Sequence, residues 1–282
     1  MLVKPTEVTF VLSTTRAGST WLGLVLGSHS WAATLGEFFR PYAIPDHVIC
    51  RLCEADGLAD CRVLRSLRDV PERDAHSFAA AALGTPMVVD ISKRPDWAAR
   101  FFDRPDLEVR LIHLVRHPAG FVESESRRSP EASLPDLCRR WEQTNRDLEV
   151  LCARSGLPAH LASYERLCDS SDTAFDELCR FLNRPFEPGA LAYWTFEHHG
   201  LGGNGAASVY LRDRRIKRYV TGDDAFYRGI ESRRTSADMR WRERLPEAIR
   251  SEAIASTYAR ELASRLGLTW SVDGYSRTAL PR

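Results

Sequence analysis

Near its start the chain has a hydrophobic run that is followed, after one short polar turn, by a helical pattern. This arrangement limits the folds that the chain can adopt. In VTFVLSTTRAGSTWLGLVLG, residues 8–13 form a continuous apolar run and residues 20–26 open a helix. A run without polar alternation is typical of a strand buried on both faces of a parallel sheet. The segment therefore predicts a strand–turn–helix unit at the start of an α/β domain.

Later segments repeat this alternation. Helical spacing of apolar residues predicts a helix at 134–151 that ends near Gly156, and another at 175–182. Short apolar runs predict further strands at 87–91 (MVVDI), 109–115 (VRLIHLV) and 160–164 (HLASY). The sequence thus predicts an α/β fold of three layers, a central parallel sheet with helices on both faces.

No repeat, low-complexity tract or convincing linker divides the chain. Its 282 residues suffice for one large α/β domain. We expect a single domain over 1–282, with the glycine-rich and then arginine-rich stretch 198–235 as a mobile closing loop. The formal net charge of +1 gives the molecule no strong electrostatic reason to bind nucleic acid or a membrane surface.

The amino terminus and the cysteines favour a cytoplasmic protein. The opening MLVKPTEVTFVL leads straight into a strand and lacks the charged start, apolar run and cleavage site of a signal peptide. No apolar segment approaches the roughly 20 residues that span a bilayer. Seven scattered cysteines, an odd number, favour reduced thiols.

The turn between the first strand and helix has the composition of an anion site. The N–H groups of residues 17–20 lie at a helix amino terminus, which offers unpaired donors and partial positive charge. Gly18 allows close backbone approach, Ser19 and Thr20 add hydroxyls, and Arg16 adds a charged fork. The alternative is a plain helix cap with Arg16 in solvent. An ordinary ATP site would instead carry a lysine before the hydroxyl, in GxxxxGK[ST].

A second anion motif follows the predicted strand at 109–115. Arg116 and Pro118 come directly after the strand, and Ser124 lies eight residues after the arginine, in the next helix. Arginine binds phosphate through two donors, a helical serine can add a hydrogen bond, and proline ends the strand. The alternative is an ordinary strand-to-helix turn with a solvated arginine.

Together the two motifs resemble the sulfotransferases that use 3′-phosphoadenosine 5′-phosphosulfate (PAPS), above all the bacterial, carbohydrate-type and tyrosylprotein-type members. Their loop [KR]-x-G-[ST]-[ST]-[WL] is matched by Arg16-Ala17-Gly18-Ser19-Thr20-Trp21, and their R-x-P with a serine eight residues on is matched by Arg116, Pro118 and Ser124. The resemblance implies a P-loop NTPase-like sulfotransferase fold and PAPS as donor. It places 16–21 at the 5′-phosphosulfate, and Arg116 and Ser124 at the 3′-phosphate.

Two further segments extend the resemblance. SYERLCDSSDTAFDELCRFLNRPFEP implies that Tyr164 lies near the adenine. HHGLGGN implies that Gly203 and Asn204 help to close over the nucleotide. The arginine that often follows Gly-Asn is replaced here by Gly-Ala-Ala, so Arg212, Arg214 or Arg215 would substitute. The resemblance covers most of 8–36, 87–126, 160–188 and 196–245.

The same resemblance suggests the catalytic groups. Glu37 in LGEFFRPY matches the glutamate that takes the acceptor proton, with Asp90 as a reserve candidate. Lys93 and Arg16 would neutralise charge on the leaving phosphate oxygen. No metal is required for this chemistry. The expected acceptor is a hydroxyl, or an amine, of a small molecule or saccharide, and its identity and the oligomeric state are left open.

Three other interpretations compete with parts of this one. A nucleotide kinase of similar architecture would bind ATP·Mg²⁺. A polyanion- or nucleic-acid-binding module would use the arginine-rich region 212–244, which Asp and Glu interrupt. HVICRLCEADGLADC offers Cys50, Cys53, Cys61 and a histidine to zinc, although cysteines at this spacing also suit a buried helical face.

Overall fold

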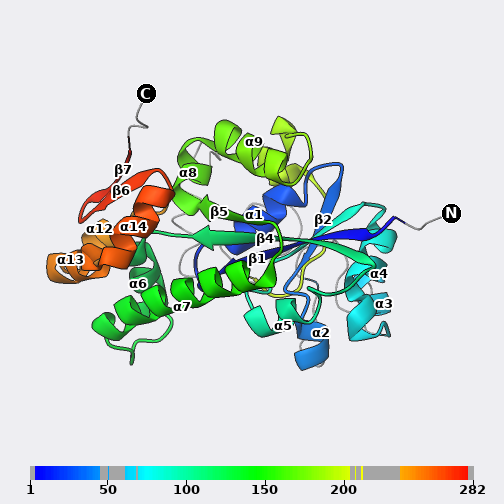
Figure 1. Cartoon of the computed structure of the whole chain (residues 1–282), viewed down its shortest axis with the longest axis horizontal. Coiled ribbons are helices and arrows are strands. Elements are labelled where there is room, and N and C mark those ends of the chain that lie inside the picture. The colour runs from blue at the N-terminus through cyan, green and yellow to red at the C-terminus, as the bar shows by residue number, and fades with distance from the viewer. Residues whose placement is uncertain are drawn as a thin grey trace.

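A five-stranded sheet forms the centre of the computed structural model (Figure 1). The structure describes residues 4–44, 50, 61–67, 69–203, 207, 211 and 236–278. The sheet has the order β2-β3-β1-β4-β5 and all its neighbours are parallel. Its strands are β1 (Thr6–Ser13), β2 (Ala32–Gly36), β3 (Met87–Asp90), β4 (Leu107–Val115) and β5 (Ala159–Ser163). The predicted α/β fold with a central parallel sheet is confirmed.

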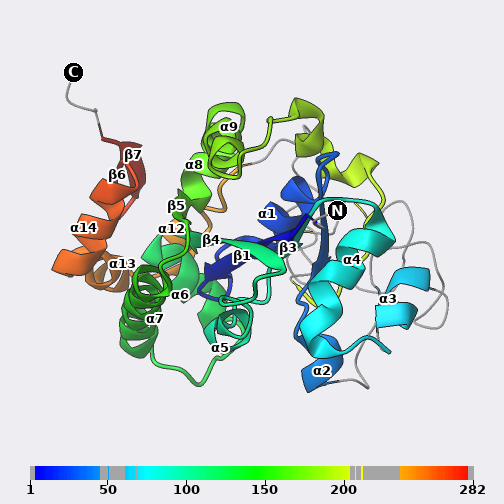
Figure 2. The same cartoon turned by 45° about the vertical axis from the view of Figure 1, so that its right-hand side comes forward.

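Helices connect the strands and cover both faces of the sheet (Figures 1 and 2). They are α1 (Ser19–Leu26), α2 (Arg40–Ala43), α3 (Arg62–Leu67), η2 (Glu72–Asp74), α4 (Ala75–Leu83), α5 (Pro95–Ala99), α6 (Pro118–Ser126), α7 (Leu134–Ser155), α8 (Tyr164–Asp169), α9 (Ser171–Phe181) and η3 (Pro188–Thr195). None of the helices in the described ranges combines the length and apolar character that crossing a membrane requires.

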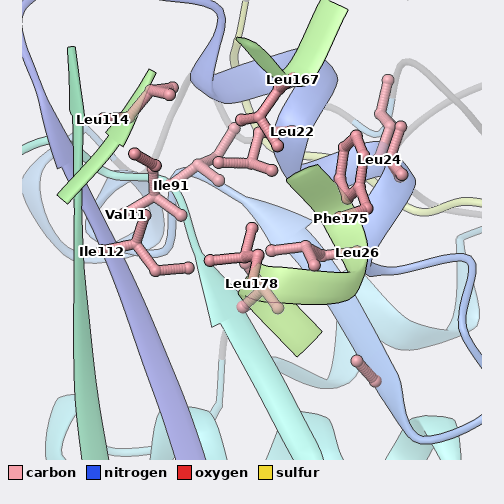
Figure 3. Close-up of a cluster of buried hydrophobic side chains, with 14 of the residues drawn as sticks. Val11, Leu22, Leu24, Leu26, Ile91, Ile112, Leu114, Leu167, Phe175 and Leu178 are labelled. Carbon is pink, nitrogen blue, oxygen red and sulfur yellow. The ribbon is translucent and has the colours of Figure 1, made fainter. Parts of the chain in front are cut away.

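The side chains of β1 alternate between the two faces of the sheet, both of which are covered, and this explains why its sequence is mostly apolar. Val8, Phe10 and Leu12 pack with residues of α3, α4, α5 and α7 on one face. Val11 points to the other face and packs with residues of α1, α8 and α9, as Figure 3 shows. Because both faces of the strand are covered, the turn that follows it is held at a fixed place at the carboxyl end of the strand.

The sequence pattern located the long helix well. Ser133 caps α7 by accepting a hydrogen bond from the backbone N–H of Asp136, and Gly156 ends the helix in the left-handed conformation, with φ of 67°. The short strand β2 was missed, because AATLG contains only one β-branched residue and shows no alternation.

A third core joins the carboxyl-terminal part to the sheet domain. Helices α12 (Trp241–Arg244), α13 (Glu247–Ala255) and α14 (Thr257–Arg265) pack with α6 and α7, together with the hairpin of β6 (Leu268–Ser271) and β7 (Gly274–Arg277). Figures 1 and 2 show this group at one end of the molecule, beside α6. The sequence patterns predicted none of these elements.

Leu178 on α9 tests the second core. It is fully buried between α9 and the sheet, so Leu178→Ala should lower the free energy of unfolding by about 2–5 kcal/mol. Val150→Ala is the matched control, because Val150 is 46% exposed on α7 and its truncation should change stability by less than about 0.5 kcal/mol. Urea denaturation measures both, and equal effects would contradict the core described here.

Candidate functional site

The turn after β1 places backbone donors and an arginine at the carboxyl ends of the strands. It runs from Thr14 to Gly18, with Arg16 and Gly18 in the left-handed conformation at φ of 64° and 93°, and α1 begins at Ser19. Arginine rarely adopts this conformation, and such backbone strain is often found at functional sites. The first N–H groups of α1 have no partner within the helix and face the turn, the arrangement that favours an anion.

Gly18 is required by its neighbours as well as by its backbone. A Cβ atom at this position would lie 2.6 Å from Cδ2 of Tyr164, the first residue of α8. Trp21 packs edge-to-face against the same tyrosine ring, with 6.2 Å between ring centroids. The turn is therefore wedged between α1 and the end of β5.

The second motif starts at the end of β4 and reaches the first. Nη1 of Arg116 donates a hydrogen bond of 2.9 Å to the carbonyl oxygen of Arg16. The guanidinium lies over the ring of Tyr164, with 5.0 Å between Cζ and the ring centroid. Ser124 lies buried on α6, the helix that Pro118 begins. Residues 100 positions apart in the sequence thus form one constellation.

Three residues that the sequence analysis did not single out position Arg116. Gly120 leaves room for it, because a Cβ there would lie 2.8 Å from Nε of Arg116. Glu165 accepts a 2.7 Å hydrogen bond from the backbone N–H of His117 and so fixes the β4–α6 turn. Asp238 lies directly against the guanidinium, with its carboxylate 3.6 Å away and its carbonyl oxygen accepting a 3.1 Å hydrogen bond.

Asp238 is a buried anion between two arginines. Burial favours its neutral form, but the hydrogen bonds from Arg240 and the positive charges of Arg116 and Arg240 outweigh burial and hold the pKa of Asp238 at about 2. The carboxylate is therefore charged at neutral pH. Arg116 accordingly already attracts one anionic group of this chain.

A second group of charges lies at the ends of β2 and β3. Oε1 of Glu37 accepts a 2.7 Å hydrogen bond from Nζ of Lys93, and Oε2 pairs with Arg40. Lys93 has a φ of 59°, so two of the three predicted catalytic residues, Arg16 and Lys93, are left-handed. The structure thus brings Glu37 and Lys93 into direct contact.

The segment around Leu201 lies against both the Glu37–Lys93 pair and the start of α1. Leu201 forms backbone hydrogen bonds with Leu35 and Glu37, and so extends the edge of β2. A Cβ on Gly202 would lie 2.5 Å from Oε2 of Glu37, and a Cβ on Gly203 would lie 2.9 Å from Cγ2 of Thr20. Gly203 therefore lies beside the anion turn, whereas Asn204, Arg212, Arg214 and Arg215 lie outside the described residues.

The reserve base is enclosed. Asp90 is 0% exposed, and its carboxylate accepts hydrogen bonds from Ser92, from Nε2 of His76 at 3.0 Å and from Nε1 of Trp97 at 2.8 Å. These hydrogen bonds enclose the carboxylate of Asp90 and fix the β3–α5 turn. Of the candidate zinc ligands, Cys50 and Cys61 lie near His199, and Cys53 lies outside the described residues.

The basic region is only partly described. Arg240 pairs with Asp238, and Arg244 pairs with Glu123 at 2.9 Å. Within 236–244 these arginines serve internal ion pairs, which weakens the polyanion-binding interpretation. Residues 212–235 lie outside the described residues.

Two solved structures resemble the chain over nearly its whole length. The sulfotransferase domain from the curacin biosynthetic pathway is 19% identical and has a TM-score of 0.53, with 94% of this chain and 98% of that chain covered. The sulfotransferase domain from the Synechococcus PCC 7002 olefin synthase is 20% identical and has a TM-score of 0.54, with 92% and 95% covered. No protein-family model and no curated protein matches the sequence. At these identities the likeness concerns the fold, and the chain has the fold of these sulfotransferase domains.

Gly18→Ala tests the wedge between the anion turn and Tyr164. We expect a loss of unfolding free energy clearly above the roughly 1–2 kcal/mol that left-handed strain costs, because the new Cβ would also meet the tyrosine ring. Gly84→Ala is the matched control, since Gly84 is left-handed and a Cβ added there would have nothing within 4 Å. Equal losses in chemical denaturation would contradict the close packing.

Proposed function

We propose that the chain is a sulfotransferase that moves a sulfuryl group from PAPS to a hydroxyl, or an amine, of a small molecule or saccharide. The observation that carries this proposal is the contact between Arg116 and the carbonyl oxygen of Arg16. It unites two anion motifs of the kind that a nucleotide with a 3′- and a 5′-phosphate needs. The fold of the two similar sulfotransferase domains supports the same conclusion.

The residues at the turn suit the 5′ end of the donor. Oγ1 of Thr14 is buried and has no hydrogen-bond partner in the described part of the chain, so a polar ligand would satisfy it. Residues Arg16 to Trp21 add backbone donors, hydroxyls and a positive charge. Arg116 and Ser124 would hold the 3′-phosphate, with Tyr164 beside the adenosine and Gly203 and Asn204 closing over it.

Glu37, Lys93 and Arg16 would carry the chemistry. When bound, PAPS supplies the sulfuryl group and a phosphate leaving group. Glu37 takes the proton of the acceptor hydroxyl as the new S–O bond forms, and Arg16 and Lys93 stabilise the charge on the phosphate oxygen as the old S–O bond breaks. The ion pair of Glu37 with Lys93 keeps the carboxylate next to the lysine that acts on the leaving oxygen.

We also infer that residues 1–282 act as one sulfotransferase domain. The carboxyl-terminal part contributes Asp238 to the surroundings of Arg116 and shares a core with α6 and α7. The two parts are thus joined by a common core and by an ion pair at Arg116. A kinase is less well supported, because no lysine precedes the hydroxyls of the turn.

Arg116→Ala tests the 3′-phosphate site. The variant should bind 3′-phosphoadenosine 5′-phosphate, the desulfonated product, about 10–100-fold more weakly, because a charged hydrogen bond is lost. Isothermal titration calorimetry of the wild type, the variant and the exposed-residue control Arg180→Ala measures this change. Tighter binding of ATP·Mg²⁺ than of the bisphosphate by the wild type would favour a kinase instead.

Glu37→Gln tests the base. We expect kcat to fall by about 10²–10⁴-fold while binding of the bisphosphate stays unchanged, because the amide cannot take a proton. A sulfuryl-transfer assay with an accepted substrate, together with calorimetry, separates the two effects. Unchanged turnover would assign proton removal to another group.

Asp238→Asn tests whether this carboxylate competes with the phosphate for Arg116. Because the charged carboxylate lies 3.6 Å from the guanidinium, its neutralisation should tighten bisphosphate binding by about threefold or more at low salt. Asp273→Asn is the control, since that carboxylate is exposed. Weaker binding in Asp238→Asn would show that Asp238 supports the site instead.

A further inference from the structure

Two thiols and an imidazole lie close together next to Leu201. Cys50, Cys61 and His199 are all buried, and their potential ligand atoms lie within 4.8 Å of one another. Sγ of Cys61 lies 3.3 Å from Nδ1 of His199, although 138 positions separate the two residues. The described cysteines form no disulfide.

The spacing of these atoms suits a tetrahedral metal. With Zn–S near 2.3 Å and Zn–N near 2.0–2.1 Å, tetrahedral angles place the ligand atoms about 3.5–3.8 Å apart. The pair of Cys61 and His199 is already near that separation, and the remaining separations exceed it by at most about 1 Å. Small side-chain rotations would therefore bring these three atoms to the separations that a tetrahedral zinc ion needs.

The surroundings add a second indication. Nε2 of His199, the ring nitrogen that faces away from the thiol, lies 3.6 Å from a carboxylate oxygen of Glu197. A carboxylate that accepts a hydrogen bond from the outer nitrogen is the usual support of a metal-bound histidine, and Glu197 lies just beyond that distance. Two thiolates with one divalent cation also carry no net charge, so the metal removes the cost of ionising thiols inside an apolar core.

We propose that Cys50, Cys61 and His199 supply three of the four ligands of a zinc site that serves the structure. Cys50 pairs with Leu201 in an isolated antiparallel bridge, and Leu201 pairs in turn with Gly36. The metal would thus fasten the segment from His199 to Gly203 to the edge of β2. Gly202 packs against Glu37, and Gly203 packs against Thr20. The zinc would therefore hold this backbone against the Glu37–Lys93 pair and against the start of α1, without entering the reaction.

The core offers a matched control. Sγ of Cys179 lies 3.7 Å from Nε2 of His29, so this pair repeats the contact of a buried thiol with an imidazole. Among the described residues, the pair of Cys179 and His29 is not part of a group of three or more side chains that could hold a metal ion. Cys179→Ser therefore reports what losing such a contact does in the absence of a metal.

The test measures metal content and affinity in the full chain, purified without chelators or a histidine tag. Elemental analysis should find about one zinc per chain in the wild type and in Cys179→Ser. Competition with a chromophoric chelator should give at least about tenfold weaker zinc binding for Cys61→Ser and His199→Ala. Cobalt in place of zinc should give a thiolate-to-cobalt charge-transfer band that Cys61→Ser weakens.

A further measurement keeps the test decisive if a variant does not fold. Chelator treatment of the wild type should lower Tm, and Zn²⁺, unlike Mg²⁺, should restore it. Three results would overturn the proposal: a wild type that takes up neither zinc nor cobalt, zinc affinity unchanged in Cys61→Ser and His199→Ala, or a disulfide between Cys50 and Cys61. None of these readouts depends on sulfuryl transfer, so the zinc site stands or falls apart from the proposed function.

Discussion

The hydrogen bond from Arg116 to the carbonyl oxygen of Arg16 is the contact on which the rest of the candidate site depends. It exists because β1 and β4 are parallel neighbours, with Ser13 opposite Leu114, so that the loops after them leave the sheet side by side. The carboxyl ends of the other strands deliver the remaining groups: Glu37 after β2, Lys93 after β3 and Tyr164 after β5. Ligands of open parallel sheets bind at the carboxyl ends of the strands.

The strands of the sheet were predictable wherever apolar residues dominate their sequences. The runs at 8–13, 87–91 and 109–115 are mostly apolar because both faces of those strands are covered, and each contains a strand. The edge strand β2 escaped detection because its pairing partner, and not its own composition, makes it a strand. Residues 236–278 fold against α6 and α7, and such long-range packing leaves no local pattern to read.

Short motifs singled out the groups of the candidate site, but only the fold could show what surrounds them. Arg16 and Arg116 were recognisable because anion sites need certain residue types at certain spacings. The space that Gly120 leaves for Arg116, and the carboxylate of Asp238 beside it, depend on segments that meet only in three dimensions. His199 joined the two cysteines in the same way, from 138 residues beyond Cys61.

We propose that both motifs hold one nucleotide at the same time. The most direct measurement compares the affinities of 3′-phosphoadenosine 5′-phosphate, adenosine 5′-monophosphate and adenosine 3′-monophosphate by isothermal titration calorimetry. We expect the bisphosphate to bind at least about tenfold more tightly than either monophosphate, because each phosphate gains charged hydrogen bonds at its own motif. A bisphosphate that binds no more tightly than one of the monophosphates would contradict it.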